Sequence, residues 1–81
     1  MLIFHGFPER RRAEEFAERV RTAYPVRTVR VYDSQDEANA ADPFPFELQP
    51  PIVHVSRTED IAEETAIEDL APDFCGVFAG T

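Results

Sequence analysis

Two strand–helix–strand passages follow one another in this chain of 81 residues, and this repeat limits the folds open to it. Each passage begins with a short apolar run, continues with a helical periodicity and ends with a second extended segment. The six segments are residues 2–7, 8–24, 26–33, 52–56, 58–70 and 74–79. They predict a single α+β domain over residues 1–81, in which helices cover one sheet.

The order β-α-β-β-α-β resembles that of ferredoxin-like sandwiches, in a likeness of topology that covers the whole chain. We expect a four-stranded antiparallel sheet in the order 4-1-3-2, with two helices on one face. Within it, the first and third strands are expected to be central, adjacent and parallel. The alternative is a small parallel βα three-layer unit with a crossover helix at 35–41, but that segment is short and poor in apolar residues. Neither topology carries a function.

The helical segments differ in how clearly they define a buried face. In the first, the apolar stripe consists of Ala13, Phe16, Ala17, Val20 and Tyr24. In the second, the residues expected to face the sheet are Ala62, Ala66, Ile67 and Leu70. The residues expected to face water are Glu59, Asp60, Glu64 and Glu68.

Two pairs of residues have the spacing of a capping box, in which a serine caps a helix that carries a glutamate three residues later. Ser34 and Glu37 predict a short helix over 35–41. Ser56 and Glu59 predict the start of the second long helix.

The single cysteine excludes an internal disulfide and a multi-cysteine zinc site. Because its neighbours are acidic or apolar, Cys75 is expected to be a buried, unreactive thiol. No run is long or apolar enough to span a membrane, and 2–7 lacks the length and basic leader of a signal peptide. We therefore expect a cytoplasmic protein with no membrane contact.

The net charge of −8 is divided unevenly along the chain. Residues 1–31 contain seven arginines and four glutamates, whereas residues 32–81 contain one arginine and twelve acidic residues. An acidic surface repels phosphate backbones, so direct nucleic-acid binding is disfavoured and a protein with a basic surface is the favoured partner.

The connection at 34–51 is a long loop rich in proline and phenylalanine between the second and third strands. Its prolines predict a stiff, extended segment, and the alternation of Phe44, Phe46 and Leu48 predicts that one side of it is apolar. Two interpretations stay open. Either both rings close an edge of the protein's own core, or Phe44, Phe46 and Glu47 form a preorganised arm that docks on a partner.

A run of carboxylates follows the third strand, and residues 58–81 contain no cation. One interpretation is a solvated helix face that also favours its own N-terminus. The other is a docking surface for a basic partner, or an imitation of a phosphate backbone such as small inhibitors from phages and mobile elements use. Its residues are Glu59, Asp60, Glu63, Glu64 and Glu68.

The expected topology places His5 and His54 on the sheet face opposite the helices, with Tyr32 one strand away. That face is expected to be covered by a second copy of the chain, a partner or the 34–51 loop. Imidazoles serve as general bases near neutral pH, so the alternative to a binding protein is a small dimeric enzyme that uses these three residues. No third ligand accompanies the two histidines, and no pattern predicts a metal or another cofactor.

The sequence thus predicts a small acidic protein-binding module, an inhibitor or regulatory adaptor, rather than an enzyme. Its expected contacts are with a basic protein surface, and a homodimer through the open sheet face is compatible with them.

Overall fold

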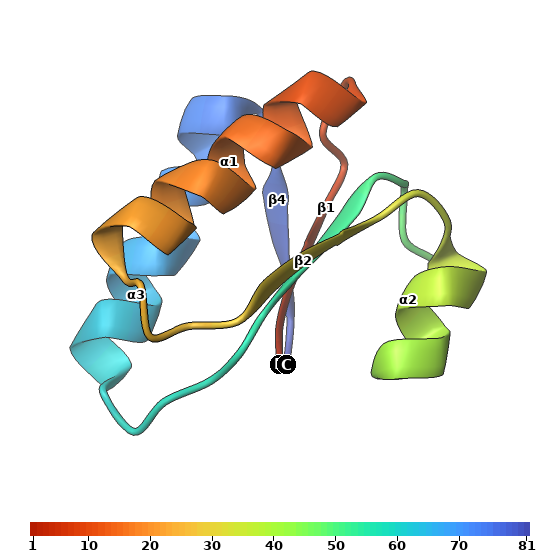
Figure 1. Ribbon diagram of the computed structural model, residues 1–81. Helices are drawn as coiled ribbons and strands as arrows, with labels where there is room; N and C mark the ends of the chain where they lie inside the picture. Colours follow the sequence, from red (N-terminus) through yellow and green to blue (C-terminus); the bar gives the residue numbers. More distant parts are fainter.

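The computed structural model describes all 81 residues and contains one four-stranded sheet with helices on both faces (Figure 1). In chain order the elements are β1 (Leu2–His5), α1 (Arg10–Ala23), β2 (Val29–Tyr32), α2 (Gln35–Ala41), β3 (Ile52–Val55), α3 (Ile61–Leu70), the 3₁₀ helix η1 (Ala71–Phe74) and β4 (Val77–Gly80). The sheet has the order β2-β3-β1-β4, and every neighbouring pair is antiparallel. This confirms the ferredoxin-like α+β prediction.

The expected parallel pairing of the first and third strands is wrong. β1 and β3 run antiparallel, with Leu2 opposite Val55 and Phe4 opposite Val53. The reason lies in the crossovers. The connection through α1 makes β1 and β2 point the same way while β3 is inserted between them, so β3 is antiparallel to both. The parallel three-layer alternative fails for the same reason.

The face of the sheet that carries α1 and α3 holds the main core. α1 buries most of its predicted apolar stripe, namely Ala13, Phe16, Ala17 and Val20. Phe16 stacks at a tilt on Phe4 of β1, with ring centroids 4.8 Å apart. The helix ends within one residue of its predicted end, because Pro25 has no N–H to continue the helical bonds after the one from the Tyr24 N–H to Val20 O at 2.8 Å.

The predicted buried face of α3 is wrong in part. Ile67 is buried as expected, but Ala62 and Ala66 are exposed and Glu64 is only 5% exposed. The predicted cap is also displaced, because the side chain of Asp60, not Ser56, accepts from the Glu63 N–H at 3.0 Å. The helix is turned this way because Glu64 has cationic partners on neighbouring segments, which makes its burial tolerable.

The segment before β4 also differs from its prediction. η1 closes with Cys75 in the left-handed region at φ 63°, and the N–H groups of Cys75 and Gly76 donate to Pro72 O and Ala71 O. Strand β4 therefore starts at Val77, and Cys75 is exposed instead of buried. Gly76 is required here because a Cβ at this position would collide with the ring of Phe7.

The other face of the sheet is covered by α2 and the extended segment 42–51, referred to below as the linker. The capping prediction for α2 is confirmed, because Ser34 Oγ accepts from the Glu37 N–H at 3.2 Å. A second, smaller core forms beneath α2 and the linker, from Ile3, Ala38, Leu48 and Ile52. The Pro50–Pro51 peptide bond is cis. None of the helices is long and apolar enough to cross a bilayer.

Candidate functional site

Side-chain amides of α2 hold the linker, and that of Gln35 makes two of the hydrogen bonds. Gln35 Nε2 donates to Phe46 O at 2.7 Å, and Gln35 Oε1 accepts from the Leu48 N–H at 2.8 Å. The two bonds hold the backbone on either side of Glu47. Further along, the Gln49 N–H donates to His5 Nδ1 at 3.0 Å, and Gly6 N–H donates to Gln49 O at 3.0 Å. The linker is thus bonded both to α2 and to the end of β1.

The two phenylalanines of the linker have different environments. Phe44 packs against the small core, and its N–H donates to Asn39 Oδ1 at 3.2 Å. Phe46 is 71% exposed, with its ring edge-on to Phe44 at 5.9 Å between centroids. The prediction of a single apolar side is therefore wrong. Phe44 and Leu48 turn inward while Phe46 points outward, because the linker is not a regular strand and Gln35 fixes its backbone around Glu47.

Exposed carboxylates lie on the two segments that Gln35 joins, the linker and the first turn of α2. Glu47, next to Phe46, is exposed, as are Asp36 and Glu37 in the first turn of α2. Gln35 begins the same turn and bonds to the carbonyl of Phe46, so these carboxylates belong to the same end of the molecule. The linker thus carries one exposed aromatic ring and is bonded to a helix turn that carries two exposed carboxylates.

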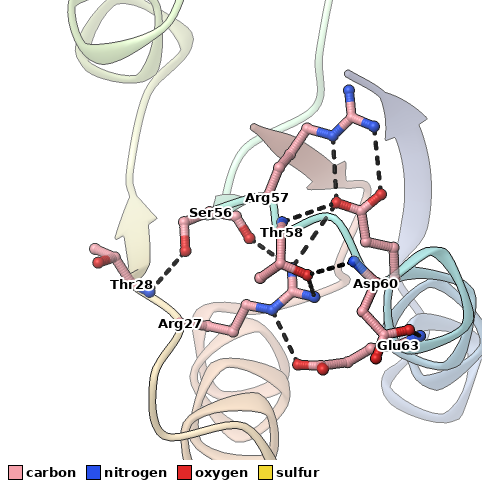
Figure 2. A network of polar contacts seen from close by, with 8 residues as sticks. Arg27, Thr28, Ser56, Arg57, Thr58, Asp60 and Glu63 are labelled. Carbon is pink, nitrogen blue, oxygen red and sulfur yellow. Dashed lines mark hydrogen bonds and ion pairs between the residues drawn. The ribbon is translucent and has the colours of Figure 1, made fainter.

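The acidic residues of α3 are placed differently, because two of them are bound by arginines (Figure 2). The side chain of Arg27, just before β2, is fully buried. Its Nε donates to Glu63 at 3.1 Å, and its two terminal nitrogens donate to Ser56 O at 2.7 Å and Thr58 Oγ1 at 2.9 Å. Arg27 thus ties the start of β2 to the β3–α3 connection and to α3.

Glu64 is the second centre of this network. It accepts from Arg57 Nε at 3.2 Å and from Arg57 Nη2 at 3.3 Å, and from the Thr58 N–H at 3.2 Å. The hydrogen bonds from Arg57 lower the pKa of Glu64, against the opposing effect of burial, and the Thr58 N–H and the charge of Arg27 act in the same direction as Arg57. Glu63 and Glu64 therefore stabilise the fold and are not available as a free acidic face.

The partner-binding residues predicted from the sequence lie on two different faces of the sheet. The structure places Phe44, Phe46 and Glu47 on the linker side of the sheet and α3 on the opposite side (Figure 1). Of the α3 set, Glu59 and Asp60 are exposed, Glu68 is half-buried, and Asp60 also serves as the helix cap. The two candidate surfaces do not merge into one.

The histidines do not form an accessible pair. Ile3, not His5, lies opposite His54 in the sheet. His54 is 1% exposed, neither of its ring nitrogens has a hydrogen-bond partner, and Tyr32 lies edge-on to it at 4.9 Å. Burial lowers the pKa of His54, and it lowers the pKa of the half-buried His5 as well.

An enzyme that used both imidazoles would need to bring a substrate to them. His54 is beneath α2 and the linker, and neither of the two surface hollows of the molecule includes a histidine. The sheet face expected to be open is therefore covered by this chain's own linker. No group of three or more metal-ligating side chains is present.

Two residues that organise these sites were not singled out from the sequence. Gln35 follows a predicted cap, and Arg27 precedes a predicted strand, but their partners lie far along the chain and no local spacing reveals them. In comparisons with protein families, with curated proteins and with solved structures, no match was found.

Proposed function

We propose that this chain is a small acidic protein-binding module, an inhibitor or regulatory adaptor, that docks a basic partner surface with Phe46 as its anchor. The observation that carries this proposal is the exposed Phe46 ring on a backbone held by the two hydrogen bonds of Gln35. An aromatic side chain that is exposed on an ordered segment has much apolar area to lose on binding.

Preorganisation supports the proposal. A flexible loop loses conformational entropy when it binds, and this loss subtracts from affinity. Here the bonds from Gln35, the inward packing of Phe44 and the prolines at 43, 45, 50 and 51 have already restricted the backbone. Most of the conformational entropy of the linker is therefore lost when the protein folds, and little remains to be lost on binding.

The charge of the molecule indicates the chemistry of the partner. The chain carries −8, Glu47 next to Phe46 is exposed, and so are Asp36 and Glu37 in the helix turn whose Gln35 bonds the linker. Such a field speeds the approach of a positively charged surface and repels acidic ones. The partner that fits is a protein with an apolar pocket for one aromatic ring and basic side chains around it.

The proposal is tested by affinity capture from lysate of the source cells, at low and high salt, with matched variants. Phe46→Ser removes the anchor, and Ile61→Ser is the control because Ile61 is 75% exposed on the opposite side of the sheet. We expect a stoichiometric, salt-sensitive partner with the unmodified chain and with Ile61→Ser. Phe46→Ser should weaken binding of that purified partner by about 30-fold or more, as for a hot-spot side chain.

Glu47→Lys tests the electrostatic contribution to binding affinity separately from the contribution of the Phe46 ring. It should lower affinity at low salt and have little effect at high salt, because exposed charges are screened. A partner that binds Phe46→Ser and the unmodified chain equally well contradicts the anchor, and one whose binding does not depend on salt contradicts the acidic docking.

A further inference from the structure

The outer edge of β2 presents backbone groups that pair with no other strand. β2 lies at one edge of the sheet and pairs only with β3. The Ser56 N–H donates to Thr28 O at 2.9 Å, so the backbone groups of Thr28 face β3. Because this direction alternates along an antiparallel strand, those of Arg30 also face β3, whereas those of Val29 and Val31 face outward. Arg21 confirms the direction, since it donates to Val29 O at 2.8 Å from α1.

A polar hollow lies along this edge, between the strand and α1. Its lining residues are Arg10, Glu14, Arg21, Val29, Arg30 and Val31. An extended chain placed here would meet the outward N–H of Val29 and both backbone groups of Val31. A groove between an edge strand and a helix is a geometry in which domains accept a peptide as an additional strand.

Arginine side chains line the hollow although the protein is acidic, and one of the three has no carboxylate partner. Three of its lining side chains are guanidinium groups and one is a carboxylate. Arg10 is paired with Glu14 at 2.9 Å and also with Asp33, and Arg21 is paired with Glu18 at 3.6 Å. Arg30 is exposed and forms no ion pair, so it is available for a carboxylate from outside.

We propose that the outer edge of β2 binds an extended acidic segment of a partner protein as a fifth strand of the sheet. The outward N–H of Val29 and the backbone of Val31 supply the main-chain hydrogen bonds, and Arg30 selects an acidic side chain. A second copy of β2 is a poor occupant, because the symmetric register that pairs Val29 with Val31 of the other copy would place the two Arg30 side chains opposite each other. This site is separate from Phe46 and does not depend on the function proposed above.

The test uses a blocked peptide of alternating glutamate and threonine, six residues long, and its lysine–threonine counterpart, with binding followed by backbone amide shifts at low salt. We expect the acidic peptide to shift the amides of Val29 and Val31 and to bind about tenfold more tightly than the lysine peptide. Arg30→Glu should remove most of that preference. Arg11→Glu is the control, because Arg11 is an exposed arginine of α1 outside the hollow.

Strand addition is tested separately from charge. Val31→Pro removes an outward N–H that no strand uses, and proline is tolerated on edge strands in that position. It should weaken the acidic peptide about tenfold. Two peptides N-methylated either at every glutamate or at every threonine give the same information on the unmodified protein, because only one set of N–H groups faces β2.

The proposal is overturned if the two methylated peptides bind equally, if the lysine peptide binds as well as the acidic one, or if neither peptide shifts the amides of β2. A difference between the methylated peptides together with loss of preference in Arg30→Glu supports it.

Discussion

The two faces of the sheet are covered by different means. On the helix face, α1 and α3 enclose a cluster of twelve buried residues that includes Phe4, Phe7 and Phe16. On the linker face, only four buried residues form the apolar cluster. Much of the attachment comes from the two bonds of Gln35 and from His5, which accepts from the Gln49 N–H.

This difference assigns two requirements of a small binding domain, global stability and an ordered binding segment, to the two faces of the sheet. A large apolar cluster resists local opening, because no part of it separates without exposing the rest to water. A small cluster supplemented by directional hydrogen bonds fixes the path of a segment while leaving a side chain such as Phe46 outside. We therefore expect the helix face to set global stability and the linker face to set the order of the candidate binding segment.

The largest effect is expected on the helix face. Phe16→Ala removes a fully buried ring that packs against Phe4, Phe7 and Phe74, and should cost about 4 kcal/mol of unfolding free energy. Urea denaturation followed by circular dichroism measures this cost. Phe16→Leu retains most of the volume and should cost less than about 1.5 kcal/mol. Equal losses in the two variants would contradict a closely packed core.

A smaller and more local effect is expected on the linker face. Leu48→Ala truncates a side chain that is 3% exposed and should cost about 2.5 kcal/mol. Because the small core has few other members, much of that cost should appear as opening of α2 and the linker. Amide hydrogen exchange should accelerate in α2 and remain slow in α1. Equal acceleration in both helices would show that the two faces unfold as one unit.

The contrast between the faces also determines what the sequence reveals. The buried stripe of α1 was predictable because all of its residues are apolar and its outer positions are charged. For α3 the same reasoning failed at Glu64, whose burial depends on Arg27 and Arg57 in other segments. Periodicity describes one helix at a time, so it does not detect an ion pair formed by the fold.

On the linker face the sequence showed that a stiff apolar segment exists, but not which ring points outward. Alternation assigns Phe44, Phe46 and Leu48 to one side, and the structure separates Phe46 from the other two. The responsible contact is the bidentate amide of Gln35, which lies outside the linker. His54 is covered because the linker docks on the sheet through the same distant contacts. The 34–51 loop was one of three covers expected for this sheet face, and the sequence did not show which one applies.

Between about pH 7.5 and pH 5.5, the pH dependence of stability should come largely from the linker face, because both histidines belong to it, whereas the lowered pKa of Glu64 acts below its ordinary value of 4.5. Burial holds the pKa of His54 below its ordinary value of 6.5, Asp42 opposes this effect, and the N-terminus reinforces it. Below about pH 6.5 the unfolded chain therefore binds more protons than the folded one. Stability is then full above that pH and falls as the pH approaches the folded pKa, by at most about 1.4 kcal/mol per pH unit for this one group.

Matched variants isolate that contribution. His54→Phe keeps an aromatic ring against Tyr32 and should reduce the loss of stability between about pH 7.5 and pH 5.5 in urea titrations. His5→Asn offers an acceptor to the Gln49 N–H and should have the smaller effect on the slope, because His5 is less buried. An unchanged slope in His54→Phe would assign the acid sensitivity to other groups.

The smallest expected effects come from two helix caps on opposite faces, in which a side-chain oxygen accepts from the N–H three residues later. Ser34 caps α2 by accepting from the Glu37 N–H at 3.2 Å, and Asp60 caps α3 by accepting from the Glu63 N–H at 3.0 Å. Removing either acceptor by substitution with alanine should cost about 1 kcal/mol at its own helix. Asp60→Ala should lower the unfolding free energy from urea denaturation by that full amount, with a corresponding fall in the midpoint, because α3 contributes Ile67 to the large core and opens only with the whole domain. Ser34→Ala should lower the midpoint less and instead accelerate hydrogen exchange in α2, since that helix opens without the main core. The opposite outcome is an equal shift in the urea midpoint for both variants, with no faster hydrogen exchange in α2. It would mean that the four-residue cluster unfolds together with the twelve-residue one. Phe46 would then lie on a segment as rigid as the helix face.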